Sequence, residues 1–299
     1  MKILCIGHIT YDTTFPVDNY PIENTKVRCY TQSECTGGPV SVAALLLGKW
    51  NADVSIAGMV GDDDYGRKIQ KEFSLNRVKT NHLVLNENID TSHSIVLSNQ
   101  ATGTRTIIMY VPKHEHMPDF TPDFAPDIIL LDGQEYEASK KLLKDYPNAI
   151  SIIDADRDKK EIIELATKVN YLVCSKAFAE KVTGIKMDFN YKQSLVDVYN
   201  KMEIMFKNLI VITLEADGCL YKHQGQLKIM PSIKVKTVDS TGAGDIFHGA
   251  FAYGVAQGFD YEKILKFANI AGALSVTRMG GYKSIPTLEE VQEVYDEVK

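Results

Sequence analysis

The sequence comprises 299 residues, with 33 basic and 39 acidic side chains and a formal charge of −6. Apolar residues make up 44% and charged residues 24%, which is typical of soluble globular proteins and excludes a disordered chain, a collagen-like chain and a disulfide scaffold. The negative charge argues against a nucleic-acid polymer as partner, although a helix terminus can still bind a small anion.

The chain begins with a short apolar run at residues 2–6, which predicts a strand. This run is too short for a signal peptide, and no stretch approaches the roughly 20 apolar residues that cross a bilayer. The five cysteines form no C-x-x-C pair, which favours buried reduced thiols over a zinc or redox site. We therefore expect a cytoplasmic protein without membrane contact.

Two polar segments interrupt the main pattern. Residues 9–36 lack a helical period and include two prolines, and residues 91–112 alternate loosely around a turn at Gly103, as a hairpin does. We interpret both segments as strands of a small β appendage inserted into the main domain.

Short runs of Ile, Val and Leu recur along the rest of the chain, and such runs are typical of strands that are covered on both faces. The stretches 161–168 and 194–206 place their apolar side chains on one side, which predicts helices. This alternation predicts βαβ units and a parallel sheet with right-handed crossovers. The predicted strands are 2–6, 54–60, 127–131, 149–153, 171–174 and 209–214.

The most informative segment is Asp239-Ser-Thr-Gly-Ala-Gly-Asp245, which joins a β-rich run to an apolar helix expected to begin near Gly242. Glycine lets a ligand approach the backbone, and the first amides of a helix lack internal partners. Together with the helix dipole, these amides favour a bound phosphate. A carboxylate in the first turn, Asp245, could accept the proton of a hydroxyl brought to that phosphate.

The same residues could instead form an ordinary glycine-rich turn. They are not a dinucleotide-binding fingerprint, because the third glycine is missing at the required spacing and the first strand is far away. Nor is Gly281-Tyr-Lys-Ser284 a P-loop, because no glycine directly precedes the lysine.

The segment from Asp239 to Asp245 resembles the second signature of the ribokinase-like (PfkB) carbohydrate kinases, commonly D-T-T-G-A-G-D. Three further motifs occur in the order and spacing of that family, so the resemblance covers nearly the whole chain. They are Gly37-Gly38 with Gly61-Asp62-Asp63 and Gly66, the turn from Thr213 to Gly218, and the segments 268–269, 273–280 and 284–286.

The resemblance implies one doubly wound α/β kinase domain over residues 1–299, with the segments 9–36 and 91–112 forming a β lid over a sugar site. It implies ATP and Mg²⁺ as cofactors and, in many members, a monovalent cation such as K⁺. The implied reaction is transfer of the γ-phosphate of ATP to a primary hydroxyl of a small sugar or sugar derivative.

The resemblance also implies roles for individual residues. Asp245 would be the base, and the amides of Gly242, Ala243 and Gly244 the anion hole. Arg105, on the lid, could contact an anionic or polyhydroxyl substrate or serve only the solubility of a strand. The remaining implied contacts are Asp12, Gly37 and Gly38 with the acceptor, Thr213, Gly218, Thr241 and Asn269 with the nucleotide, and Asp239, the Thr241 backbone and Ser284 with K⁺.

Several of these residues have simpler interpretations. Asp12 could be a solvated turn carboxylate, and Asn269 an amide on a helix surface. We interpret the acids at 62–64 as helix caps. The pair His114 and His116 lacks a third ligand at metal spacing and so indicates a polar loop.

Three positions depart from the family pattern. Val42 stands where many sugar kinases have asparagine, so a hydrogen bond to the sugar is lost or replaced. Ser175-Lys-Ala-Phe178 replaces an N-x-x-E motif that helps to organise Mg²⁺, and Glu215 replaces a glycine. The Ser-x-x-Phe pattern, with the segments 130–133 and 152–157, resembles the ketohexokinase-like and sulfofructose-kinase-like subgroup.

Other functions stay open. A nucleoside kinase of the same fold would be supported by a stacking aromatic in the lid. A non-catalytic sugar-binding relative is suggested by Val42 and Phe178 and opposed by the intact Asp245 and its glycines. An oxidoreductase fails on the missing fingerprint. Exposed lid strands pair readily, which predicts a homodimer through the lid.

Overall fold

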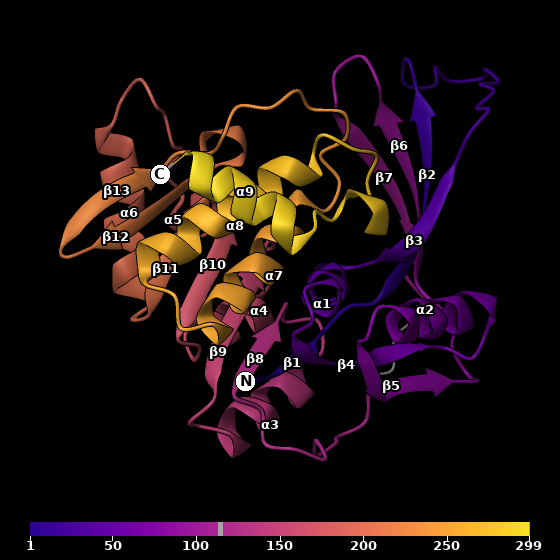
Figure 1. The fold of residues 1–299 in the computed structure, drawn as a ribbon, viewed down its shortest axis with the longest axis horizontal. Coiled ribbons are helices and arrows are strands. Elements are labelled where there is room, and N and C mark those ends of the chain that lie inside the picture. The colour runs from indigo at the N-terminus through magenta and orange to yellow at the C-terminus, as the bar shows by residue number, and fades with distance from the viewer. Residues whose placement is uncertain (113–115, 299) are drawn as a thin grey trace.

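The computed structural model describes residues 1–112 and 116–298, and two β-sheets organise this part of the chain (Figure 1). Within it, the large sheet has the strand order β13-β12-β11-β10-β9-β8-β1-β4-β5, and the small sheet has the order β3-β2-β6-β7. The large sheet is parallel from β11 to β5, and β12 and β13 are antiparallel. Its strands are β1 (Lys2–Ile6), β4 (Asp53–Gly61), β5 (Lys79–Asn86), β8 (Ile128–Leu131), β9 (Ile150–Ala155), β10 (Tyr171–Ser175), β11 (Leu209–Thr213), β12 (Cys219–His223) and β13 (Gln226–Met230).

Helices cover both faces of the large sheet, because its central strands are apolar on both sides. In β1, Ile3 and Cys5 pack into one hydrophobic core, while Leu4 and Ile6 pack into the other. The predicted α/β class with a doubly wound, mostly parallel sheet is therefore confirmed. The first core includes side chains of α1 (Pro39–Lys49), α2 (Asp64–Leu75), α7 (Ala243–Ala256), α8 (Tyr261–Ser275) and α9 (Leu288–Glu297), and the second those of α3 (Tyr136–Asp145), α4 (Lys160–Ala166), α5 (Lys176–Thr183) and α6 (Gln193–Met205).

All six predicted strands are present, and their ends differ from the prediction by two residues at most. The prediction missed the two edge strands of the large sheet, β5 and β13, and also β12, which lies next to β13. Edge strands are partly exposed and alternate with polar residues. They therefore lack the continuous apolar run that marks a central strand.

The small sheet consists of β2 (Thr10–Val17), β3 (Ser33–Gly37), β6 (His93–Asn99) and β7 (Arg105–Tyr110). The two polar segments meet where β2 pairs in parallel with β6, so the prediction that both supply strands to one appendage is confirmed. Residues 18–32 contain no strand and connect β2 to β3. In the register, Asp12 lies opposite Ser94 and Arg105 opposite Ser98. Because Ser94 and Ser98 are four residues apart on one strand, Asp12 and Arg105 lie on the same face.

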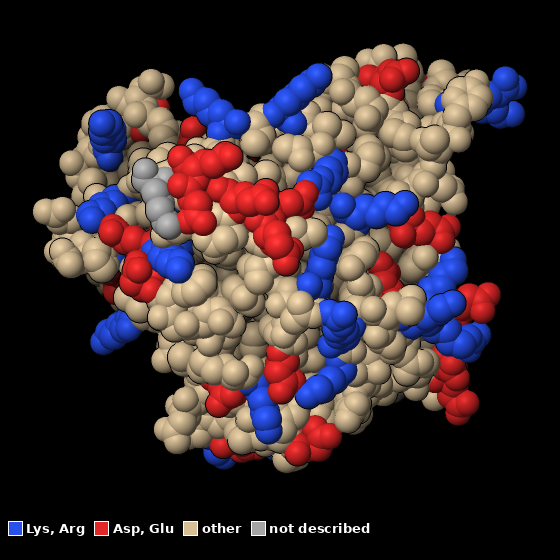
Figure 2. Space-filling view, viewed as in Figure 1, with Lys and Arg blue, Asp and Glu red and all other residues tan. Residues whose placement is uncertain are grey.

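The surface carries an acidic region. Figure 2 shows acidic side chains gathered over α9, whose sequence contains Glu289, Glu290, Glu293, Asp296 and Glu297. Among the described residues, no helix is long and apolar enough to cross a membrane.

Candidate active site

Helix α7 begins with a glycine cap that has no side chain. Gly242 is the N-cap, and its φ of +79° lies in the left-handed region that glycine tolerates. The first helical hydrogen bond runs from the Ile246 amide to the Gly242 carbonyl at 2.9 Å. Of the amides predicted for the anion hole, that of Ala243 instead donates to the Ser240 carbonyl at 3.4 Å. The amides of Gly244 and Asp245 point beyond the helix start, at the positive end of its dipole. The predicted helix start near Gly242 is confirmed.

The loop before α7 is held by a buried carboxylate. Asp239 is fully buried, and its Oδ1 accepts hydrogen bonds from the Thr241 amide at 2.9 Å and the Thr241 hydroxyl at 2.7 Å. Its Oδ2 accepts from the Gly280 amide at 2.9 Å. Ser284, also buried, donates to the Gly281 carbonyl at 2.7 Å. Asp239 thus ties the start of α7 to the 280–284 turn.

Asp245 lies in the first turn of α7, partly buried beside groups from the small sheet. Burial raises its pKa to about 6, with Asp156 and Asp12 adding to the rise and the Arg105 guanidinium opposing it. Arg105 reaches across from β7 and donates to the Ser240 carbonyl at 3.1 Å and the Ser240 hydroxyl at 2.9 Å. The small sheet is therefore joined to the loop that positions Asp245.

Asp12 lies against the backbone of Gly37, and its carboxylate accepts hydrogen bonds from Ser94 and Thr10. It lies in β2 rather than in a solvated turn, and burial raises its pKa. A Cβ on Gly37 would stand 2.0 Å from Oδ2 of Asp12, and one on Gly38 would stand 2.3 Å from the His8 carbonyl oxygen. Gly38 also has a φ of +97°, so neither position admits a side chain without movement. The structure thus places Asp12, Gly37 and Gly38 together, near Asp245.

Three of the residues predicted for the nucleotide lie at the end of β11, before β12 and on α8, whereas Thr241 lies in the loop before α7. Gly218 has a φ of +98°, and a Cβ there would stand 2.0 Å from the Met230 carbonyl oxygen. The Asn269 amide donates to the same carbonyl at 3.3 Å. Asn269 is buried, so the surface-amide interpretation is wrong. Thr213, at the end of β11, donates to the Cys174 carbonyl at 3.3 Å.

The chain that brings these residues together matches known proteins over nearly its full length. A family model described as pfkB family carbohydrate kinase matches residues 1–288. This chain belongs to the pfkB family.

Similar proteins agree with this assignment. Ribokinase from Bacillus subtilis is 27% identical over 98% of this chain and 99% of its own length. A crystal structure described as a ribokinase from Agrobacterium tumefaciens superposes with a TM-score of 0.89 at 26% identity, covering 99% of this chain and 98% of that one. Ribokinase from Arabidopsis thaliana, solved with ribose and ATP, has the same fold, with a TM-score of 0.80 at 22% identity and 98% coverage of both chains. This pfkB protein is a phosphotransferase that acts on a hydroxyl group, and in broad terms a sugar kinase.

The three departures from the pfkB pattern have structural counterparts. Val42 is buried beside the turn that precedes α7, where its Cγ1 stands 3.8 Å from an ideal Cβ on Gly242. Phe178 packs in the core against Phe206, so the motif that carries a carboxylate in relatives is here a core contact. Glu215 keeps the left-handed backbone that a glycine would adopt, with a φ of +56°.

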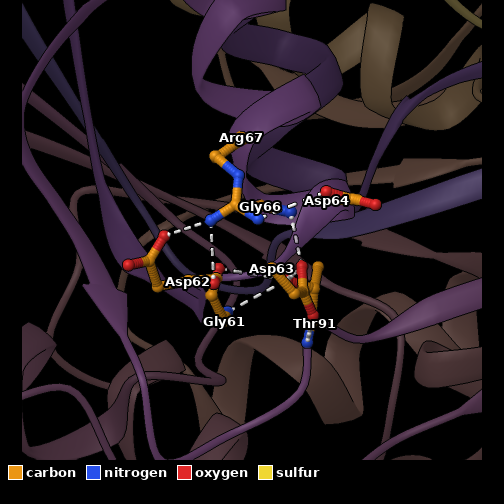
Figure 3. A network of polar contacts seen from close by, with 7 residues as sticks. All are labelled: Gly61, Asp62, Asp63, Asp64, Gly66, Arg67 and Thr91. Atoms are coloured by element: carbon orange, nitrogen blue, oxygen red, sulfur yellow. Dashed lines mark hydrogen bonds and ion pairs between the residues drawn. The ribbon is translucent and has the colours of Figure 1, made fainter.

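Of the acids at 62–64, Asp63 alone caps α2 as predicted, whereas Asp62 and Asp64 form ion pairs with Arg67 (Figure 3). Asp63 is the N-cap of α2 and accepts from the Gly66 amide at 2.8 Å. It also accepts from the Thr91 amide at 2.8 Å and the Thr91 hydroxyl at 2.7 Å, while Asp62 and Asp64 pair with Arg67. Asp63 thus fixes α2 to the segment that enters the small sheet.

Sequence reasoning assigned no role to three acids and a histidine near Asp245: the buried Asp132, Asp154 and His248, and the exposed Asp156. Burial raises the pKa of Asp132 to about 7, and its oxygens accept from the amides of His8 and Gln134 at 2.9 Å each. The available signal was position, because Asp132, Asp154 and Asp156 lie at or just after the carboxyl ends of β8 and β9. His114, of the pair interpreted as a polar loop, lies outside the described residues.

Proposed function

We propose that this protein transfers the γ-phosphate of ATP to a primary hydroxyl of a small sugar or sugar derivative. The observation that carries the proposal is the position of the Asp245 carboxylate. It lies beside a helix terminus that has no side-chain cap, near Asp12 and Arg105 of the small sheet. The Arabidopsis ribokinase, which binds ribose and ATP, supports the choice of both substrates.

The chemistry follows from this placement. Asp245 accepts the proton of the acceptor hydroxyl while the oxygen of that hydroxyl attacks the γ-phosphorus. The new O–P bond forms while the bond to the β-phosphate oxygen breaks, and ADP leaves. The amides at the start of α7 stabilise the charge on the transferred group. The small sheet, acting as a lid, would keep water from taking the place of the sugar.

Mg²⁺ is implied by the family. Among the described residues, no group of three or more His, Cys, Asp or Glu could hold a metal ion. We therefore assign Mg²⁺ to the nucleotide phosphates and to water, which commonly supply most of its ligands. Bound there, it would neutralise phosphate charge. The K⁺ site near Asp239, Thr241 and Ser284 stays a prediction, which a comparison of turnover in K⁺ and in tetramethylammonium would test.

Recognition of the acceptor centres on Asp12 and Val42. Asp12 offers carboxylate oxygens to sugar hydroxyls, whereas Val42 offers none, so the acceptor contacts an apolar surface on the α1 side. A nucleoside is the second candidate acceptor, and a lapsed kinase that only binds sugar is the third. A sugar kinase, a nucleoside kinase and a binding protein differ in which acceptor, if any, causes release of ADP.

The test is release of ADP with ATP, Mg²⁺ and K⁺ across a panel of ribose, fructose, tagatose, fructose 6-phosphate, 2-keto-3-deoxygluconate and nucleosides. One acceptor should stand well above the others. Asp245→Ala should then lower its turnover by at least about 100-fold while ATP binding stays intact. Asp64→Ala is the matched control, because Asp64 also lies in a first helical turn but is 95% exposed. Retention of more than about a tenth of the turnover in Asp245→Ala would rule out the base.

We further propose a homodimer through the outer face of the small sheet, opposite the face of Asp12 and Arg105. Ile95, Ile108 and Tyr110 leave 42%, 60% and 46% of their surface exposed there. Sedimentation equilibrium should show a dimer that Ile108→Glu converts to a monomer. A wild-type monomer at high micromolar concentration would exclude this interface.

A further inference from the structure

A buried pair of titratable side chains, Asp154 and His248, lies next to the first turn of α7. Asp154 is near the carboxyl end of β9, and His248 follows Asp245 by three residues on α7. Their exposed fractions are only 7% and 3%. Oδ2 of Asp154 and Nδ1 of His248 are 3.1 Å apart. The proposed phosphoryl transfer uses neither side chain.

Both ring nitrogens of His248 also face backbone carbonyl oxygens. Nδ1 is 2.7 Å from the Gly244 oxygen, and Nε2 is 3.1 Å from the Val173 oxygen. A carbonyl oxygen only accepts, so each ring nitrogen forms a hydrogen bond with its carbonyl only when that nitrogen carries a hydrogen. If Nδ1 were unprotonated and Asp154 ionised, three acceptor atoms would meet without a donor: Nδ1, the Gly244 oxygen and Oδ2 of Asp154. A second proton between Nδ1 and Oδ2 removes this conflict and leaves the pair without net charge.

Several titratable groups surround Asp154 and His248, so the charge of the pair affects its neighbours. Burial raises the pKa of Asp154, and Asp245 on α7, Asp156 after β9 and Asp132 after β8 raise it further, while Arg157 lowers it. The Cys174 thiol on β10 also faces Asp154. Burial lowers the pKa of His248, whereas the two carbonyl contacts and Asp156 raise it. Without the imidazole, two close carboxyl groups, Asp154 and Asp245, would compete for one proton.

We propose that Asp154 and His248 share one proton and form an uncharged positioning pair that keeps Asp245 ionised and holds the Gly244 carbonyl. This inference rests on the proposed role of Asp245 as the base. The imidazole supplies the proton that Asp154 needs, so the pair carries no net negative charge. Asp245 can therefore lose its own proton without repulsion from Asp154. Because Gly244 belongs to the anion-hole turn, the same contact fixes the amides next to the phosphate.

The first test needs no acceptor. Side-chain ¹⁵N NMR of the full chain, recorded between about pH 5.5 and pH 8.5, reports the proton on each histidine nitrogen. His248, identified by the loss of its signals in His248→Asn, should keep a protonated or partly protonated Nδ1 throughout. In Asp154→Asn, that nitrogen should shift to the unprotonated position. An unprotonated Nδ1 in the wild type that Asp154→Asn leaves unchanged would overturn the shared proton.

The chain offers a matched control for this experiment. His82 and Asp123 also form a pair at 3.1 Å, but 61% of the Asp123 side chain is exposed. Asp123→Asn should therefore leave both the ¹⁵N signals of His248 and the kinase turnover unchanged. A shift of the His248 signals in Asp123→Asn as large as that in Asp154→Asn would show that the change is not specific to the buried pair.

The second test uses the acceptor with the highest turnover in the panel. Asparagine at position 248 can still donate to the Gly244 carbonyl but cannot supply the shared proton. His248→Asn should therefore lower kcat at least about tenfold near pH 6 and less than about threefold near pH 8. The double variant with Asp154→Asn should recover most of the loss near pH 6, because no second carboxylate remains.

Two outcomes separate the inference from its premise. A loss in His248→Asn that is equal at every pH, or that the double variant does not recover, would mean a purely structural role and overturn the proposal. Full turnover in Asp245→Ala would instead reject the proposed base, which the NMR experiment does not depend on. If His248→Asn fails to fold, Asp154→Asn alone gives the decisive NMR comparison.

Discussion

Helices α2 and α7 both begin where glycine and aspartate occur together, yet their first turns are built differently. The α2 terminus is capped by the Asp63 carboxylate, and its first-turn acid, Asp64, is 95% exposed and paired with Arg67. The α7 terminus is capped by Gly242, which has no side chain, and its first-turn acid, Asp245, is partly buried with its pKa raised to about 6.

The difference shows what separates a structural helix start from a site. A side-chain cap satisfies the first amides within the protein, so the α2 terminus needs nothing further. A glycine cap leaves the amides to a ligand, and burial of the neighbouring acid adjusts its proton affinity. Motif composition alone does not distinguish the two cases, because both segments are rich in glycine and aspartate.

Among changes to the two caps, the largest effect is expected from Gly242→Ala. Alanine in a left-handed conformation costs about 1 kcal/mol, and any relief of that strain turns the amides away from the phosphate. Turnover should fall at least about tenfold, measured with the best acceptor of the panel, and the free energy of unfolding by about 1 kcal/mol.

Gly184→Ala is the matched control for that change. Gly184 ends α5 with a φ of +68° and has open space around its Cβ position, so it carries the same strain without a site. It should lose a similar free energy of unfolding and keep its turnover. Equal turnover in both variants would mean that the α7 terminus does not hold the phosphate.

A smaller effect concerns pH. Asp245 acts as a base only when ionised, so kcat should decline as the pH falls through about 6. Because Arg105 lowers the pKa of Asp245, Arg105→Gln should move this decline to higher pH. Arg67→Gln, at the α2 terminus, should leave the midpoint in place. A midpoint that does not move in Arg105→Gln would show that the guanidinium does not act on the base.

The smallest effect on catalysis is expected at the α2 cap. Asp63→Ala removes the cap and the contacts with Thr91, which should lower the free energy of unfolding by about 0.5–2 kcal/mol. Urea titration measures this change. Turnover per folded molecule at saturating substrate should remain within about twofold of the wild type, and a loss as large as that of Gly242→Ala would erase the distinction between the two termini.

Much of the fold was predictable because its signals are local. Central strands such as β1 and β10 are apolar on both faces and appear as continuous runs, whereas β5 and β13 lie at edges and do not. The start of α7 was predictable from Gly242, since a helix cap depends on a few neighbouring residues. The cap at Asp63 was predictable for the same reason.

The sequence by itself determined the family, the parallel sheet and the identity of the candidate base, because these depend on motifs and periodicity within short segments. Only the tertiary structure decided which charges surround that base. Arg105 comes from β7, Asp12 from β2, and the pair of Asp154 and His248 from β9 and α7. Proton affinity depends on burial and on charges that are near in space and remote along the chain, so it emerges only when the strands are packed together.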